Sequence, residues 1–162
     1  MEVSEDISTE GDIEAGVVQI SGERRLLSIV DIGAELRLFA CACSARVLDL
    51  YERIYPGDDR PRRAIRIARE YARGRVTASE LRSAFILARD VADAAPAGSA
   101  ARCAAMAASG CVADEPQDGA MLAIWGAGWA ADGKDAAGGA ERVWQRALFA
   151  RMIERRVGSL TA

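Results

Sequence analysis

The chain of 162 residues has no histidine, and Lys134 is its only lysine. Histidine is the usual general base of enzymes and the commonest metal ligand of proteins, so a site of either kind would have to use other groups. Aromatic residues make up 6% of the chain, whereas alanine makes up about a fifth of it. Alanine favours helices, and scarce aromatic and β-branched residues disfavour strands. The composition therefore predicts an all-α fold.

Recognisable metal and redox motifs are also missing. Cys41 and Cys43 are two residues apart, which places them on nearly opposite sides of a helix, and Cys103 and Cys111 lie far along the chain. We expect four small buried hydrophobic side chains in a reducing compartment, with an all-cysteine zinc site as the less favoured alternative. We therefore expect no metal and no cofactor.

Long apolar runs are absent as well. No run is long enough to span a bilayer, and the acidic N-terminal region lacks the apolar stretch with basic flanks of a signal peptide. We expect a cytoplasmic protein that does not associate with membranes.

Charge and periodicity divide the chain into two parts. Residues 1–15 carry six acids and no base, which predicts a flexible acidic tail. Residues 16–162 are predicted to form one domain, an antiparallel bundle of about six helices, because the connections between the amphipathic segments are short. The expected helices cover about residues 33–55, 58–73, 77–95, 99–112, 117–133 and 138–157.

The stretch YPGDDRPRRAI contains the start of the second helix. Asp58 or Asp59 can accept hydrogen bonds from the free amides of the first turn, and Pro61 fits there because its missing N–H costs nothing. Thr77 and Glu80 have the spacing of a capping box at the start of the next helix. These local signals predict where two helices begin.

The second helix carries four arginines that fall within about 60° of one another when projected at about 100° per residue. We call them the arginine stripe: Arg62, Arg66, Arg69 and Arg73. Because like charges repel, the stripe either tolerates repulsion in salt water or pairs with acids such as Asp58, Glu70 or Glu80. It could also dock on an acidic protein or on nucleic acid. The pI of 5.1 and the lack of an aromatic platform argue against nucleic acid.

Aromatic residues and acids offer fewer candidates. Trp125 and Trp129 lie one helical turn apart and could line an apolar ligand pocket between helices, with core packing as the alternative. In the last helix the apolar spacing predicts that five side chains face inward: Val143, Trp144, Ala147, Leu148 and Ile153. No serine can have a histidine partner, and the paired acids are explained as helix caps or turns. We expect no catalytic residue and no enzymatic activity.

Residues 36–84 contain a cysteine-containing helix, Tyr-Pro, an acidic run with Asp-Arg-Pro-Arg, an alanine- and arginine-rich helix ending in glycine, and a capped third helix. This pattern resembles the immunity-protein-five-like family of bacterial polymorphic-toxin systems. The closing ERVWQ, residues 141–145, is similar to the family's Glu-x-x-Trp-Gln. Family members usually carry several histidines in the alanine-rich second half, and this chain has none.

The resemblance implies a small, non-enzymatic cytoplasmic protein that neutralises a cognate protein toxin by stoichiometric occlusion. The expected partner-binding residues are Asp58, Asp59, Arg60, Arg62, Arg66, Arg69 and Arg73. An opposing interpretation is that Asp59 and Arg60 tie the first two helices together. Two other functions stay open: a small-molecule-binding bundle that uses the pocket at Trp125 and Trp129, and a nucleic-acid accessory protein that uses the arginine stripe. The sequence leaves the choice between monomer and homodimer open.

Overall fold

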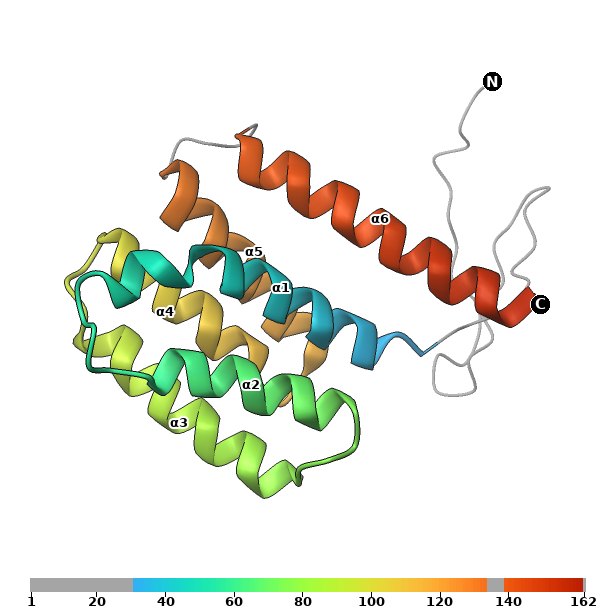
Figure 1. The fold of residues 1–162 in the computed structure, drawn as a ribbon, viewed down its shortest axis with the longest axis horizontal. Coiled ribbons are helices and arrows are strands. Elements are labelled where there is room, and N and C mark those ends of the chain that lie inside the picture. The colour runs from blue at the N-terminus through green and yellow to red at the C-terminus, as the bar shows by residue number, and fades with distance from the viewer. Residues whose placement is uncertain (1–30, 134–138, 162) are drawn as a thin grey trace, which may run out of the picture. The chain divides into compact units, whose positions relative to one another are not determined.

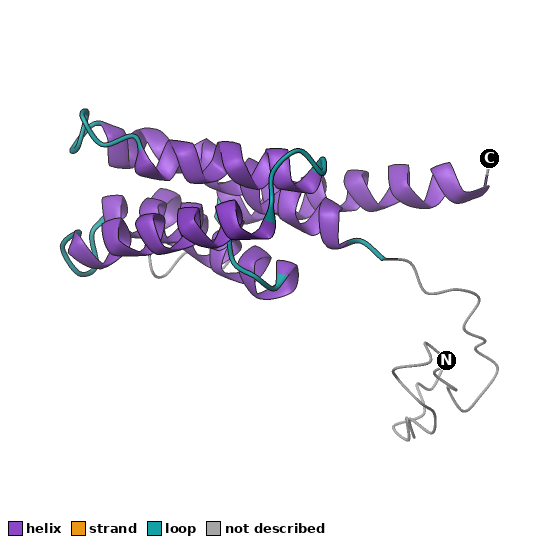
Figure 2. Ribbon diagram, turned by 90° about the horizontal axis from the view of Figure 1, so that it is seen from below, coloured by secondary structure: helices purple, strands orange, loops and turns teal. Residues whose placement is uncertain are grey.

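A computed structural model describes residues 31–133 and 139–161 of the chain. In these ranges the chain forms six α-helices and no strand (Figure 2), so the predicted all-α fold is confirmed. The helices are α1 (Gly33–Glu52), α2 (Arg60–Ala72), α3 (Ala78–Ala94), α4 (Ala100–Cys111), α5 (Pro116–Asp132) and α6 (Ala140–Thr161). The predicted acidic tail, residues 1–15, lies outside the described residues, and its boundary stays a prediction.

Helix α4 is the centre of the bundle. Helices α1, α2, α3 and α5 pack against it, and α6 packs on α1 and α5 (Figure 1). Nine of its 12 residues are buried, and most of these are alanine, cysteine or glycine. Because these side chains are small, the neighbouring helices can approach α4 closely, and together they cover most of its surface. The abundance of alanine in the chain therefore serves the packing of this central helix.

Glycines bring the backbones of α4 and α5 into contact. A Cβ atom added to Gly126 would lie 2.7 Å from the carbonyl oxygen of Cys103 and 2.8 Å from the amide nitrogen of Ala107. A Cβ atom added to Gly110 would lie 2.6 Å from the carbonyl oxygen of Gly119. Such distances are too short for a real side chain, so the two helices can pack this closely only where glycine stands.

The helix starts follow the predicted local signals with one distinction. Thr77 Oγ1 accepts a hydrogen bond from the Glu80 amide, and the Glu80 carboxylate accepts one from the Thr77 amide, so the capping box is confirmed. At the start of α2, Asp58 Oδ1 accepts a hydrogen bond of 3.1 Å from the Arg60 amide. Asp59 occupies the cap position but its side chain makes no capping hydrogen bond.

The inward face of α6 differs in part from the expectation. Trp144 and Leu148 pack against the core as predicted, but Val143 is 62% exposed and Ala147 is exposed as well. Glu141 and Gln145 are buried in their place. A periodicity of apolar residues places Val143 inward, whereas the rotation of α6 follows from polar contacts that Glu141 and Gln145 make with other helices.

Candidate partner-binding surface

The end of α1 and the start of α2 are joined by a cluster of three side chains. The buried Tyr51 hydroxyl donates a hydrogen bond of 2.8 Å to Asp58 Oδ2. Arg60 Nε donates one of 2.8 Å to Asp58 Oδ1, and a second guanidinium nitrogen of Arg60 pairs with Oδ2 at 2.5 Å. The carboxylate of Asp58 thus holds two helices across the turn. The tie between the helices uses Asp58, where the opposing interpretation had placed Asp59.

The same contacts shift the ionisation of both acidic groups. Hydrogen bonds from Arg60, supplemented by the one from Tyr51, hold the pKa of Asp58 well below its usual range. Burial, together with the hydrogen bond to the Asp58 carboxylate, raises the pKa of Tyr51 well above its usual value. Asp58 is therefore a charged carboxylate and Tyr51 a neutral phenol at neutral pH, the pair of states that the hydrogen bond between them requires.

The two ends of the arginine stripe are paired with acids. Arg62 donates to both carboxylate oxygens of Glu52, at 2.7 and 2.5 Å, across the turn between α1 and α2. Arg73 donates to Glu70 at 2.9 Å. Glu70 had been anticipated as a partner, whereas Glu52 had not. The ends of the stripe are therefore partly neutralised within the chain.

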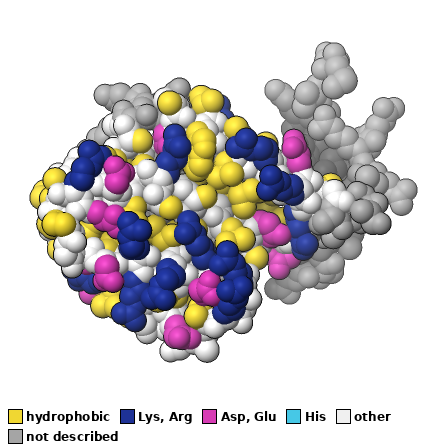
Figure 3. Space-filling view, viewed as in Figure 1, with side chains coloured by type: hydrophobic (Ala, Val, Ile, Leu, Met, Phe, Trp, Pro, Cys, Tyr) yellow, Lys and Arg dark blue, Asp and Glu magenta, His cyan; other side chains and the backbone are white. Residues whose placement is uncertain are grey.

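The middle of the stripe is not neutralised in this way. The side chains of Arg66 and Arg69 make no hydrogen bond or ion pair with any residue in the described ranges. Arg66 is exposed and Arg69 is half-buried. Arginine side chains gather over α2 on the face of the molecule seen in Figure 3. Two guanidinium groups are thus available to an outside acid.

A groove of about 580 Å³ runs between α1 and α2 beside these arginines. Its apolar floor includes the buried Leu48 and Ile65. The full lining is Ala45, Leu48, Asp49, Glu52, Arg62, Ile65, Arg66, Arg69, Glu70 and Arg73. All four stripe arginines therefore line one surface, together with the two acids that pair with the outer two. We call it the α1–α2 groove.

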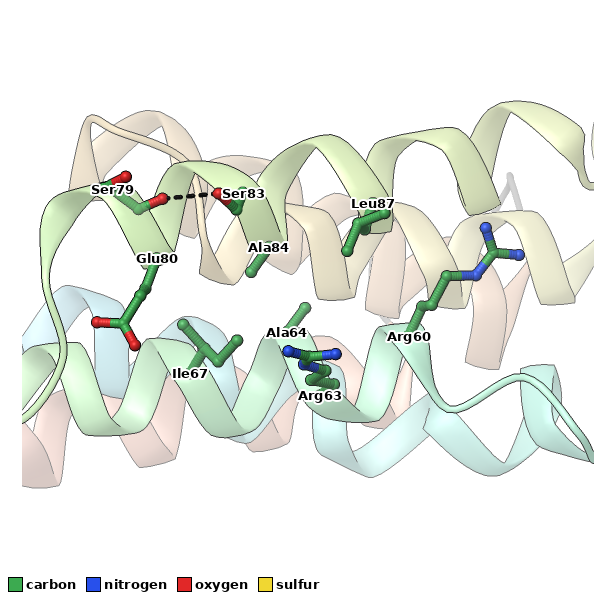
Figure 4. A pocket seen from close by; sticks show the side chains of 9 residues that line it. All are labelled: Arg60, Arg63, Ala64, Ile67, Ser79, Glu80, Ser83, Ala84 and Leu87. Carbon is green, nitrogen blue, oxygen red and sulfur yellow. Dashed lines mark hydrogen bonds between the residues drawn. The ribbon is translucent and has the colours of Figure 1, made fainter.

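A smaller cavity of about 160 Å³ lies on the other side of α2, against α3 (Figure 4). Arg60 and Arg63 contribute from α2, and Ser83 from α3 donates a hydrogen bond of 2.9 Å to the carbonyl oxygen of Ser79. Arg60, whose guanidinium pairs with Asp58, lines this cavity and does not line the α1–α2 groove. The predicted partner-binding residues are thus divided between two sides of α2.

The closing ERVWQ motif meets α1 at Arg46. Arg46 Nε donates a hydrogen bond of 2.6 Å to Glu141 Oε2, and its guanidinium lies 4.6 Å from the centroid of the Trp144 ring. Gln145 Nε2 donates to Glu141 Oε1 and to the carbonyl oxygen of Ile124, both at 3.3 Å. The motif therefore fastens α6 to α1 and α5, and its role seen here is in the fold.

Comparison with known proteins bears on this chain directly. The family described as Imm-5 like putative immunity protein matches residues 33–151. The chain belongs to this family. The match covers both stretches on which the resemblance rests, residues 36–84 and 141–145. Neither a curated protein nor a solved structure was found to match the chain.

Two sequence stretches that this Imm-5 like protein shares with its family join helices of the bundle, a role that the sequence pattern alone does not predict. Asp58, in the Tyr-Pro-acidic stretch, accepts the hydrogen bond from Tyr51 that joins α1 to the start of α2. Glu141, in ERVWQ, accepts the hydrogen bond from Arg46 that joins α6 to α1. In the arginine stripe, the side chains that have no partner in the described ranges and could bind another protein are the two in the middle, Arg66 and Arg69.

A buried arginine that the sequence analysis missed supports the same core. Arg37 is 4% exposed and donates to the carbonyl oxygens of Cys111 and Ala113, both at 2.8 Å, and of Asp114 at 3.1 Å. Its guanidinium thus satisfies free carbonyls at the C-terminus of α4, where the helix dipole also favours a cation. The position of Arg37 among apolar α1 residues was the available signal, since it falls three residues before the inward Ala40.

The four cysteines are buried, as predicted, and none of them forms a disulfide among the described residues. Cys111 Sγ donates to Ser44 Oγ at 3.1 Å. Burial, with the nearby Glu141 charge, raises the pKa of Cys43 to about 12, and burial also raises the pKa of Cys111. Both groups are therefore thiols at neutral pH, and the thiol is neither the nucleophilic nor the metal-binding form.

Trp125 and Trp129 pack against each other with ring centroids 6.2 Å apart. Trp129 contributes to the core, whereas Trp125 is 44% exposed. The ligand pocket at these two residues stays a prediction. Among the described helices, none combines the length and apolar character needed to cross a membrane.

Proposed function

We propose that this Imm-5 like protein neutralises a cognate protein toxin by binding it stoichiometrically, without a cofactor and without catalysis. In this proposal the bacterial cytoplasm is the site of action, and the acidic toxin surface lies on the α1–α2 groove. The observation that carries the proposal is the pair of arginines in the middle of that groove, Arg66 and Arg69, which have no intramolecular acid partner in the described ranges.

Physical chemistry favours an acidic protein as the partner. Arginine binds carboxylates through two parallel hydrogen bonds and is enriched at the centre of protein interfaces. Arg66 and Arg69 stand three residues apart on one helix face, so their charges repel each other in the free protein. A partner carboxylate would remove that repulsion without first breaking an internal ion pair.

The structure suggests how the seven predicted residues divide in this role. Arg66 and Arg69 would form the centre of the contact, and the paired Arg62 and Arg73 its rim. Rim ion pairs are exposed and contribute little affinity, but they set the charge pattern that a partner meets. Asp58 and Arg60 lie outside the groove and would act by holding the start of α2 in place, and Asp59 would contact the partner at the exposed start of that helix.

Capture and growth experiments test the proposal together. The wild type, an Arg66→Glu/Arg69→Glu variant and an Arg63→Glu control would be immobilised and exposed to lysate from the organism that encodes the chain. Arg63 is an exposed arginine of the same helix that lines the opposite cavity, so its variant changes charge without touching the groove. Circular dichroism would establish that all three proteins are folded.

The expected result is a protein held in one-to-one ratio by the wild type and by Arg63→Glu, but not by the double variant. That protein should stop bacterial growth when produced alone, and co-production of the wild type should restore growth. A captured protein that is harmless when produced alone would contradict the immunity role. Equal capture by the double variant would leave the immunity role standing and move the interface away from the groove.

A further inference from the structure

A second cavity, of about 360 Å³, lies between α1, α5 and α6. None of its lining residues belongs to the α1–α2 groove. Phe39 and Phe149, whose ring centroids lie 5.2 Å apart, and Ile124 give it an apolar wall. Its volume falls within the range of about 300–1,000 Å³ that small-molecule sites occupy.

One buried polar atom at this cavity lacks a partner. Gln145 lines the cavity and is 3% exposed, and its Oε1 atom has no hydrogen-bond partner in the described ranges. Its Nε2 group faces two acceptors, Glu141 Oε1 and the carbonyl oxygen of Ile124, at 3.3 Å each. Because both neighbours are acceptors, the amide cannot be turned round, and Oε1 is left as an acceptor that requires a donor.

Two cationic side chains line the same cavity. Arg142 also lines the cavity, and its Nε atom is buried without a hydrogen-bond partner in the part of the chain that the structure describes. Arg146, one helical turn further along α6, lines the cavity and is exposed. Buried polar atoms without partners are costly and rare, and two of them belong to side chains that line one apolar cavity, which favours a ligand that satisfies both.

We propose that this cavity binds a small amphipathic carboxylate that carries one N–H or O–H donor between its apolar body and its charged end. The apolar body packs on Phe39 and Phe149, the donor binds Gln145 Oε1, and the carboxylate binds the guanidinium groups of Arg142 and Arg146. The site is independent of the proposed toxin contact, because the two use different faces of the bundle.

N-octanoylglycine is a suitable probe, because it has an apolar chain, one amide N–H and a carboxylate. Its binding to the full chain would be measured by isothermal titration calorimetry. N-octanoylsarcosine carries an N-methyl group in place of the N–H donor, and the methyl ester of N-octanoylglycine has no charge. Arg146→Gln tests the cation, and Arg151→Gln is its control, an exposed arginine of α6 outside the cavity lining.

We expect N-octanoylglycine to bind the wild type and Arg151→Gln alike, and to lose about tenfold in affinity with Arg146→Gln, as is usual for one hydrogen bond to a charged group. N-methylation should cost about tenfold in the wild type, and the ester should bind the wild type and Arg146→Gln equally. No binding up to about 1 mM would overturn the proposal. So would equal binding of the sarcosine compound, or an unchanged affinity of Arg146→Gln. Toxin capture should be unaffected by Arg146→Gln, so the two proposals fail separately.

Discussion

The guanidinium of Arg46 on α1 lies 4.6 Å from the centroid of the Trp144 ring on α6 and donates a hydrogen bond to the buried Glu141. This relationship joins residues 95 positions apart in the chain. It combines an ion pair with a cation–π contact, and it accounts for two of the sequence features by which the family is recognised. Helix α6 also packs on the bundle through apolar side chains, through the hydrogen bond from Gln145 to the Ile124 carbonyl and through the ion pair of Arg156 with Glu35, and Arg46 adds to these contacts.

Replacing Arg46 with methionine should lower the free energy of unfolding by about 1–3 kcal/mol, because it leaves the buried Glu141 carboxylate without its guanidinium. This cost is smaller than that of breaking a fully buried pair, because the Arg46 side chain is 47% exposed and solvent weakens its interaction. Urea unfolding monitored by circular dichroism would measure the change. Arg53→Met is the control, since its ion pair with Asp49 is exposed and should contribute less than about 1 kcal/mol. Equal effects of the two substitutions would contradict the assigned role of Arg46.

Gly126→Ala should destabilise the protein by about 1–3 kcal/mol, because the added Cβ would collide with the backbone of α4. Gly128 lies in the same helix, and a Cβ there would meet only Arg142 Nε, at 3.5 Å. Gly128→Ala should therefore be neutral or stabilise by up to about 1 kcal/mol, the usual gain when alanine replaces glycine in a helix. Thermal unfolding of both variants would test the pair, and a Gly126→Ala protein as stable as Gly128→Ala would show that α4 and α5 do not pack this closely.

Asp58→Asn should cost about 1–3 kcal/mol of unfolding free energy at neutral pH, because Arg60 and Tyr51 both bind the charged carboxylate. The folded-state pKa of Asp58 is lowered, so this stabilisation is complete above the ordinary aspartate pKa of about 3.9 and is lost as the pH falls below it. The difference between wild type and variant should therefore shrink below about pH 4.

Urea unfolding at several pH values would measure that difference. Asp59→Asn is the matched control, because the Asp59 side chain is exposed and makes no capping bond. Its effect should stay within about 0.5 kcal/mol at every pH. A difference for Asp58→Asn that is constant down to about pH 2 would show that the charge of Asp58 contributes nothing.

The four thiols should react with a disulfide reagent at pH 8 at least about tenfold more slowly in the native protein than in urea, because all four are buried and the reagent reaches them only when the structure opens. The time course of absorbance after mixing would count the reacting groups. One thiol reacting at its unfolded rate would contradict the burial of that cysteine.

Local sequence signals were sufficient for the helices and several of their ends. The capping box of Thr77 and Glu80 involves residues three apart, and the hydrogen bond from the Arg60 amide to Asp58 involves residues two apart. Such contacts form within a single turn of chain, so they can be predicted from spacing and residue type. The alanine-rich composition likewise predicted a fold made of closely packed helices.

Contacts between distant residues could not be predicted in the same way. The stripe was visible as a periodic pattern, but the pairing of Arg62 with Glu52 depends on the turn that brings α2 back along α1. The burial of Arg37 depends on carbonyl groups more than 70 residues away, at the end of α4. Val143 was expected inward because apolar spacing does not reveal that Glu141 and Gln145 set the rotation of α6.

The amino-acid order therefore accounts for the helical class, most helix limits and the presence of a cationic stripe, because each of these depends on neighbours within a few residues. The folded arrangement accounts for which stripe arginines remain without an acid partner and for the polar atoms left at the α1–α5–α6 cavity. Those properties depend on which charged and polar groups of separate helices come next to one another or next to apolar surface. These contacts, and the free energy they contribute, arise only when the helices pack together.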